Sequence, residues 1–413
     1  MKLLLGRQAI LDREKNLAAY ELLFRNLDNT SICSETEATA SVLSTALNMF
    51  GTESILGNKR GFINIGMDLL RKDLLDILPP KKYVIEILET QIPSPELIQL
   101  IRHLKTKGYI FALDDFVIND ENLIYWRPVL QEVQIVKVDV LETTEKNLKT
   151  KTEILAAYNV ALLAEKVETT EIFDLCYDLG FHYFQGYFFT KPSLVEGTGF
   201  DTNTQGIIQI IKLLKQDVEI EDIERILKNH PDLIISLLKL VNSASVSPIQ
   251  EITSIRQTIA LLGKRALSQW LLLMLYSKKM SESQTTSSNP LFLLAAQRGK
   301  MMELIIRSHA GSKISRTLSD ESFLTGLLSL SDTLLHVPLK IILEEIHVSK
   351  GISDALLFNK GHLGSALMIV KMLEQNQINK IYDLIRDFHM DVESINKISV
   401  DSMSYSHEFA KAF

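Results

Sequence analysis

Residues 82–115 read KYVIEILETQIPSPELIQLIRHLKTKGYIFALDD and contain two short apolar runs with a longer amphipathic stretch between them. The runs Lys82–Leu88 and Tyr109–Leu113 are rich in Val, Ile and Phe, a composition typical of buried strands. In Pro95–Lys107 the apolar residues recur at helical spacing. A strand, a helix and a second strand in this order predict a βα unit of a parallel sheet.

The same alternation recurs through the first half of the chain. Further strand-like runs are Ala18–Phe24, Gly61–Ile65, Val133–Val138, Ala161–Ala164 and His182–Phe189. Further stretches with helical spacing are Glu37–Phe50 and Thr170–Leu179. Roughly seven or eight such units in about 190 residues favour a small (β/α)8 barrel. An open doubly wound sheet is the alternative, although no glycine-rich phosphate loop follows the first strand.

The pattern changes beyond Val195–Gly206, a segment rich in Gly and Thr that is typical of a linker. Helical spacing then recurs at Ile207–Leu214, Ile220–Leu227, Asp232–Val241, Ile255–Leu262, Leu267–Tyr276 and Pro290–Arg307. Gly263 is placed to end one of these helices, and no comparable strand-like run appears. The sequence therefore predicts a barrel over residues 1–196, a linker over 197–206 and an all-α domain over 207–413.

The composition excludes several classes of protein. A net charge of -7 argues against a nucleic-acid binder, which usually carries a basic surface. Cys33 and Cys176 are too few for a disulfide framework and predict reduced thiols. The apolar residues before Gly6 are too few for a signal peptide, and the apolar stretch Trp270–Tyr276 is too short to cross a bilayer. We therefore expect a cytoplasmic protein that does not bind membranes.

Polar residues stand at or near the end of almost every predicted strand. They are Glu21, Asn64, Glu86, Asp114, Asp115, Lys137, Asp139, Glu165 and Gln185. A single acidic residue after a strand is more often a helix cap, but the carboxyl ends of barrel strands converge on one face. Carboxylates gathered there need cations, and oxygen ligands without Cys or His favour Mg²⁺ or Mn²⁺. A pair of such ions is suited to cleaving a phosphodiester.

Seven sequence blocks also occur in the order of a known family. They are YELLFR, FINIG, VIEILET, ALDDF, IVKVD, AEKVET and FQGYFFTKP. Over residues 1–195 the chain thereby resembles the EAL domain. The resemblance implies a (β/α)8 barrel that hydrolyses cyclic di-GMP to a linear dinucleotide, with two Mg²⁺ or Mn²⁺ ions if it is active.

The resemblance also implies roles for individual residues. Those matching metal ligands are Glu21, Asn64, Glu86, Asp114 and Asp115. Glu165 matches a ligand or a base for the attacking water, and Lys137 matches the lysine that orients that water. The remaining matches are Arg25 for a substrate phosphate, Gln185 for a polar residue of the site, and Glu89 and Glu168 for glutamates that anchor a loop near the metals.

Three departures from the family pattern bear on turnover. The namesake motif reads Glu21-Leu22-Leu23, which keeps the ligand. A loop usually rich in glycine reads Val117-Ile118-Asn119, and Val and Ile do not readily take the backbone angles that glycine allows. The glycine that usually follows Glu165 is Lys166, which adds charge beside the site. We therefore expect hydrolysis that is slow, conditional or absent.

The second half resembles HDOD domains, relatives of metal-dependent HD phosphohydrolases. The clearest block is LLKLVNSASVSPIQEITSIRQTIALLGKRALSQWLLLM, and FLTGLLSLSD is a weaker match. The His-Asp doublet of those enzymes is absent, and Ser329-Leu330 stands where it is expected. Several histidines show no ligand spacing, namely His230, His309, His336, His347 and His362. This half is therefore expected to bind a protein partner or to dimerise.

Three hypotheses follow. The first is a cyclic di-GMP signalling protein whose barrel binds the dinucleotide and metal, with an HDOD half that passes the state to a protein partner. The second is a catalytically inactive receptor or a protein-interaction scaffold. The third is hydrolysis of another phosphodiester, because ligands fix the chemistry more firmly than the substrate. The sequence does not fix the oligomeric state, although many EAL barrels form homodimers.

Overall fold

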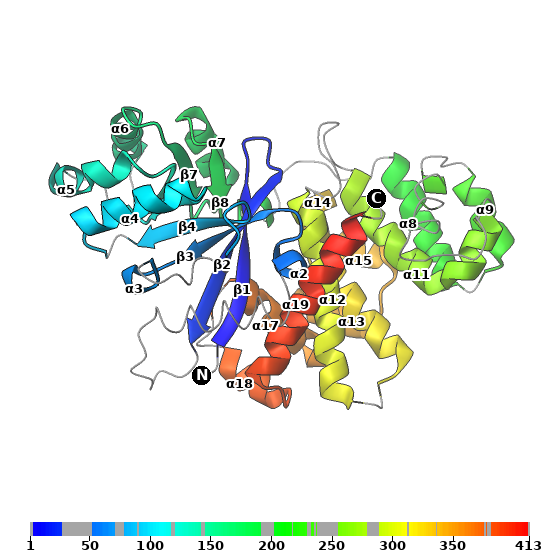
Figure 1. The fold of residues 1–413 in the computed structure, drawn as a ribbon. Coiled ribbons are helices and arrows are strands. Elements are labelled where there is room, and N and C mark those ends of the chain that lie inside the picture. Colours follow the sequence, from blue (N-terminus) through cyan, green and yellow to red (C-terminus); the bar gives the residue numbers. More distant parts are fainter. Residues whose placement is uncertain are drawn as a thin grey trace. The chain divides into compact units, whose positions relative to one another are not determined.

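The computed structural model describes residues 3–26, 52–70, 78–88, 91–116, 120–141, 145–190, 202–216, 218–228, 233–234, 237, 255–278, 289–311, 314–335, 337–375, 377 and 381–411. The chain divides into two compact units (Figure 1). Unit 1 comprises Met1–Lys191, Glu374–Asn379 and Val392–Asn396. Unit 2 comprises Pro192–Leu373, Lys380–Asp391 and Lys397–Phe413.

The strands of unit 1 close into a barrel in the order β1 to β8, which confirms the predicted barrel. They are β1 (Leu3–Leu11), β2 (Leu17–Asn26), β3 (Arg60–Asn64), β4 (Tyr83–Leu88), β5 (Ile110–Asp114), β6 (Ile135–Asp139), β7 (Ala161–Glu165) and β8 (Tyr183–Gln185). Neighbours from β2 to β8 pair in parallel. Strand β1 is antiparallel to both β2 and β8, so the sheet is not wholly parallel.

Strand β1 is the element that the sequence pattern did not reveal. Its apolar residues are interrupted by Gly6, Arg7 and Gln8, so the segment shows neither a continuous apolar run nor a clean alternation. A tight turn joins it to β2: Asp12 Oδ1 accepts hydrogen bonds from the backbone N–H groups of Glu14 and Asn16. This local turn makes an antiparallel hairpin, whereas every later strand is reached through a longer connection.

The helices of unit 1 lie outside the strands (Figure 1). They are α2 (Thr52–Leu56), α3 (Met67–Leu70), α4 (Pro95–Thr106), α5 (Asp120–Leu130), α6 (Glu145–Leu155), α7 (Thr170–Asp178) and the 3₁₀ turn η2 (Phe188–Thr190). Helix α4 shows why they form: Ser94 caps its first turn, and Leu97, Ile101 and Leu104 recur on one buried face. The predicted helix Glu37–Phe50 lies outside the described residues.

An apolar layer fills part of the barrel interior. It takes one buried residue from each of seven strands, namely Ile10, Ala19, Phe62, Val84, Ala112, Ile135 and Leu163. Side chains two positions apart on a strand point to the same face. The residue two positions beyond each of these on β2 to β7 therefore also faces the interior, which places a second layer next to the first.

Helices alone make up the described part of unit 2. They are α8 (Thr202–Lys215), α9 (Ile220–Leu227), α11 (Ile255–Lys278), α12 (Pro290–Ala310), α13 (Arg316–Leu328), α14 (Ser331–Leu335), α15 (Leu339–Ile346), α16 (Lys350–Phe358), α17 (Gly361–Glu374), α18 (Ile381–Asp387) and α19 (Val392–Lys411), where α17 and α19 each have one end in unit 1. Helix α8 begins at Thr202, inside the expected linker over 197–206. Most of the predicted helix Asp232–Val241 lies outside the described residues.

Two glycines shape these helices. Gly263 has φ 76° and interrupts α11, at the position where the sequence predicted a helix end. Gly326 lets α13 approach α12, because a Cβ there would lie 2.5 Å from the backbone oxygen of Arg298. Across the described residues, no helix is both long enough and apolar enough to span a membrane.

Candidate functional site

A polar layer lies directly beside the apolar layer of the barrel. Each member stands two residues after a member of the apolar layer: Glu21 after Ala19, Asn64 after Phe62, Glu86 after Val84, Asp114 after Ala112, Lys137 after Ile135 and Glu165 after Leu163. The strand period of two thus turns six polar residues inward. The parallel strands bring them to the same end of the barrel.

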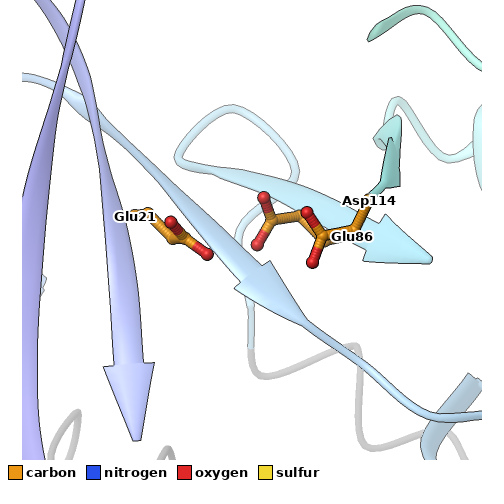
Figure 2. Close-up of side chains that lie close together, drawn as sticks. All are labelled: Glu21, Glu86 and Asp114. Carbon is orange, nitrogen blue, oxygen red and sulfur yellow. The ribbon is translucent and has the colours of Figure 1, made fainter. Parts of the chain in front are cut away.

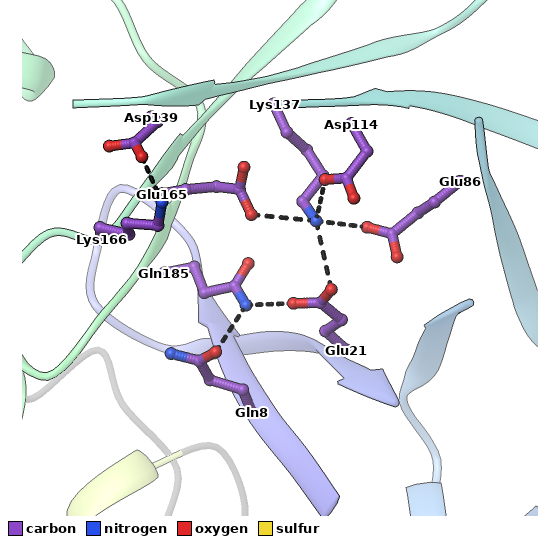
Figure 3. A network of polar contacts seen from close by, with 9 residues as sticks. All are labelled: Gln8, Glu21, Glu86, Asp114, Lys137, Asp139, Glu165, Lys166 and Gln185. Atoms are coloured by element: carbon purple, nitrogen blue, oxygen red, sulfur yellow. Dashed lines mark hydrogen bonds and ion pairs between the residues drawn. The ribbon is translucent and has the colours of Figure 1, made fainter. Parts of the chain in front are cut away.

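Lys137 lies at the centre of this layer, on β6. Its ammonium nitrogen, Nζ, is 2.6 Å from Glu86 Oε1 and 2.6 Å from Asp114 Oδ1. The same atom is 3.0 Å from Glu165 Oε1 and 3.3 Å from Glu21 Oε1 (Figure 3). The lysine is fully buried, and the carboxylates are buried around it. Four carboxylates therefore share one cation, which has three N–H donors.

Burial and charge act against each other on these groups. Burial lowers the pKa of Lys137, but the surrounding carboxylates outweigh that effect and hold its pKa well above the usual range. Burial raises the pKa of Glu86 well above its ordinary value, and the neighbouring carboxylates Glu21 and Asp114 add to the effect. Burial likewise raises the pKa of Glu165 to about 8. The site thus holds more acid groups than its own lysine can keep ionised.

The carboxylates form two clusters of the size that holds a metal ion. The inner cluster is Glu21, Glu86 and Asp114 (Figure 2), and the outer cluster is Asp114, Asp115 and Glu165. Within each cluster, one oxygen of each residue lies within 4.8 Å of the others. Glu86 Oε2 and Glu165 Oε2 are buried and accept no hydrogen bond from the described residues. Unsatisfied anionic oxygens at this spacing fit hard divalent cations such as Mg²⁺ or Mn²⁺.

Two amides extend the polar layer on the side of Glu21. Gln185 Nε2 donates hydrogen bonds to Glu21 Oε2 and to Gln8 Oε1, the second at 2.9 Å (Figure 3). The sequence did not point to Gln8. On β1 the polar residue stands two positions before the apolar residue Ile10, whereas on β2 to β7 it stands two positions after. The order is reversed because β1 runs antiparallel to its neighbours. Recognising β1 as a strand would have revealed Gln8.

At the edge of the polar layer, Lys166 pairs with Asp139. Lys166 Nζ donates to Asp139 Oδ2, and Asp139 is the register partner of Glu165 (Figure 3). Lys166 has φ 57° and Asp115 has φ 46°, so both take the left-handed conformation that favours glycine. For Lys166 this agrees with the glycine expected at its position.

The remaining predicted residues are placed as follows. Asn64 is half-buried at the end of β3, and its Oδ1 has no hydrogen-bond partner among the described residues. Glu168 is half-buried beyond β7. Arg25 lies on β2, but its side chain is outside the description, as are Glu89 and the loop 117–119. The roles of all these residues, and of those in the two clusters, stay predictions.

In unit 2, Ser329 stands where a metal-binding doublet was expected. Its Oγ accepts a hydrogen bond of 2.7 Å from the guanidinium of Arg298, a buried residue. Fixed positive charge beside this position disfavours a metal ion. The ring of His309 lies tilted against His362 and stacked against His389, with ring centroids 5.3 and 6.1 Å apart, a proximity that the sequence spacing did not predict. These imidazoles are outside the candidate metal clusters of the described residues.

Comparisons with known proteins match both halves of the chain. The EAL domain model matches residues 66–192 and the HDOD domain model matches residues 202–335. The chain is 29% identical over 416 residues to the uncharacterized protein YuxH of Bacillus subtilis, with all of both chains covered. It is 27% identical over 411 residues to the cyclic di-GMP phosphodiesterase CdgJ of Vibrio cholerae, covering 98% of this chain and 92% of that one.

A solved structure of the Bacillus subtilis YkuI protein, with an EAL domain, also matches. That structure is a complex with the substrate cyclic di-GMP and calcium. It is 20% identical, covers 64% of this chain and 73% of its own, and superposes with a TM-score of 0.38.

Proposed function

Because the chain contains an EAL domain followed by an HDOD domain, we propose that its barrel binds cyclic di-GMP with divalent metal ions and hydrolyses it under restricted conditions. The observation that carries this proposal is the polar layer, in which four buried carboxylates surround the single ammonium of Lys137. Such an excess of buried negative charge is costly in itself and favours bound cations. The relative CdgJ is named a cyclic di-GMP phosphodiesterase, which supports the same substrate for this chain.

The two clusters fit the metals that the family implies. The residues that would hold them are Glu21, Asn64, Glu86, Asp114, Asp115 and Glu165. Bound Mg²⁺ or Mn²⁺ would supply positive charge to offset the charge that develops on the phosphodiester oxygens. The protein contributes largely buried oxygen ligands held on or directly after five strands, β2 to β5 and β7.

The chain's own residues would act on a water molecule and the phosphate. Lys137 would donate a hydrogen bond that orients the water, and Glu165 would serve either as a metal ligand or as the base that accepts a proton from the water. The water oxygen forms a new bond to phosphorus while one P–O ester bond breaks, and the released oxygen takes up a proton. The products are one linear dinucleotide per molecule of cyclic substrate. Arg25 would hold a non-reacting phosphate through its guanidinium.

Chromatography of cyclic di-GMP incubated with the full-length protein and Mn²⁺ or Mg²⁺ tests the proposal. We expect the linear dinucleotide to appear and Glu21→Ala to slow its formation by about 100-fold or more, since even changes to residues that only hydrogen-bond to metal ligands cost about 10–100-fold. Glu153→Ala, an exposed position on α6, is the matched control and should keep the wild-type rate.

Intact nucleotide with both wild type and Glu21→Ala would reject hydrolysis. Calorimetry with cyclic di-GMP and Ca²⁺, the ion present in the YkuI complex, would then separate the alternatives. Heat of binding would make the protein a receptor, and its absence would make it a scaffold. If the protein hydrolyses a different cyclic nucleotide and not cyclic di-GMP, the proposed substrate is wrong but the proposed reaction, phosphodiester hydrolysis, stands.

We also propose that the helical half passes the nucleotide state to a protein partner. The guanidinium of Arg298 donates to Ser329, which stands where the His-Asp doublet was expected, and this fixed positive charge favours a binding role over metal catalysis there. Hydrogen exchange in α8 to α19 should change when cyclic di-GMP and Ca²⁺ are added. Exchange in these helices that is identical with and without the nucleotide would contradict the transmission.

A further inference from the structure

Lys166 is an unusual residue for its place in the chain. It directly follows Glu165, the last residue of β7, with a backbone φ of 57°. A residue with a Cβ adopts this conformation at a free-energy cost that glycine avoids. Its side chain is half exposed, and its Nζ is held by Asp139. Lys166 therefore adopts an unfavourable backbone conformation, and its ammonium group is held by Asp139 next to Glu165 of the outer cluster.

The two carboxylate clusters differ in what surrounds them. Lys166 directly follows Glu165, and its ion-pair partner Asp139 is the register partner of Glu165 on the neighbouring strand. The carboxylates that act on its charge are Asp139, Asp115 and Glu165. Asp115 and Glu165 belong to the outer cluster, and none of these three belongs to the inner cluster. The charge of Lys166 therefore acts chiefly on the outer cluster.

We propose that Lys166 is a built-in counter-ion of the outer cluster that weakens its affinity for a divalent cation, so that the inner cluster fills first. This inference rests on the proposed function and extends it. If hydrolysis requires both clusters to be filled, turnover would depend on the concentration of free divalent cation. Lys166 would then be the residue that makes hydrolysis conditional.

The size of the effect follows from simple electrostatics. A unit positive charge near the site of a divalent ion, in a partly solvated environment, changes the affinity for that ion by about 10-fold or more. Salt screens exposed charges, and the side chain of Lys166 is half exposed. The effect should therefore shrink as the salt concentration rises.

Manganese titration of the full-length protein without nucleotide tests the proposal, with bound Mn²⁺ counted by electron paramagnetic resonance. Lys166→Gly and Lys166→Asn both remove the charge and accept the left-handed backbone, so the fold should be kept. Lys166→Arg keeps the charge. We expect two binding steps in wild type. In the neutral variants the Mn²⁺ affinity of the weaker binding step should rise by about 10-fold or more, and the affinity of the stronger step should stay within about twofold of wild type.

Removing Lys166 also frees the carboxylate of Asp139, which could itself bind metal. Adding Asp139→Asn to Lys166→Gly controls for this, and the tightened weaker step should persist in the double variant. Lys166→Arg should behave like wild type, and the difference between wild type and Lys166→Gly should shrink in roughly 0.5 M KCl.

The inference is overturned if Lys166→Gly and Lys166→Asn leave the weaker step unchanged, or if they tighten both steps equally. It is also overturned if the tightening disappears in the double variant. In each of these cases wild type still binds Mn²⁺, so the proposed function stands. If wild type binds no Mn²⁺ at all, the proposed function fails, and the inference fails with it.

Discussion

Lys137 determines the energetics of the site at the scale of single residues. Its ammonium cannot satisfy the four carboxylates that lie within 3.3 Å of it, because it has three donors. Leaving anionic oxygens buried and unpaired costs folding free energy. The charged layer is therefore costly to fold unless further positive charge compensates it.

The raised pKa of Glu165 predicts how metal binding depends on pH. Metal ions bind the ionised carboxylate, and the pKa of Glu165 in the metal-free protein is about 8. Below pH 8 an ion that enters the outer cluster must displace the proton of Glu165, so the affinity of that cluster for Mn²⁺ should fall by about tenfold per pH unit between pH 8 and pH 6 for each proton released. Above pH 8 the affinity should level off. Calorimetry in buffers of different ionisation enthalpy measures the protons released.

The control for this experiment is Glu153→Gln, an exposed position that should leave the pH profile unchanged. Glu165→Gln removes the titrating group and should flatten the profile while weakening binding. An affinity for Mn²⁺ that is equal at pH 6 and pH 8 in wild type would show that the carboxylates are already ionised and would contradict the prediction.

At the scale of elements, the sequence predicted the parallel strands because their apolar runs are continuous and polar residues mark their ends. It also predicted that Glu21, Glu86, Asp114 and Glu165 would converge, since parallel strands end on one face. It missed β1 and with it Gln8, because an antiparallel strand with polar interruptions has neither signal. The clusters themselves depend on side-chain distances across the barrel, which no local pattern encodes.

The junction between β8 and η2 gives a prediction at the same scale. Gly186 has φ 151°, and a Cβ there would lie 2.0 Å from the backbone oxygen of Val167. The backbone cannot move away easily, because Val167 N–H donates to the carbonyl of Gln185. Gly186→Ala should therefore lower the free energy of unfolding by about 3 kcal/mol or more. Chemical denaturation measures the change.

Gly180 provides the matched control for this substitution. It has φ 87°, but a Cβ there would meet nothing within 4 Å. Gly180→Ala should therefore cost about 1–2 kcal/mol, the backbone strain alone. Equal losses at the two positions would show that backbone strain, and not the clash with Val167, dominates at Gly186.

At the scale of the whole molecule, the units do not follow the order of the chain. The sequence predicted a barrel that ends at residue 196, whereas unit 1 also contains Glu374–Asn379 and Val392–Asn396. Within unit 1, Asn396 Oδ1 accepts a hydrogen bond of 2.9 Å from Leu5 N on β1, and Tyr187 donates to the carbonyl oxygen of Glu374. The two contacts join residues 391 and 187 positions apart, and contacts at such separations leave no periodic trace in a sequence.

These contacts predict that residues 1–196 alone make a less stable barrel than the one in the full chain. Without Asn396, the N–H of Leu5 loses its acceptor, and a partly buried donor without a partner costs about 1–3 kcal/mol. In the full chain, Asn396→Ala should lower the unfolding free energy of the barrel by about 1 kcal/mol, while Lys397→Ala, at the next and exposed position, should leave it unchanged. Hydrogen exchange of the Leu5 amide reports on this bond directly. If exchange at Leu5 is as slow in Asn396→Ala as in wild type, the bond from Asn396 does not stabilise the barrel, and this prediction is wrong.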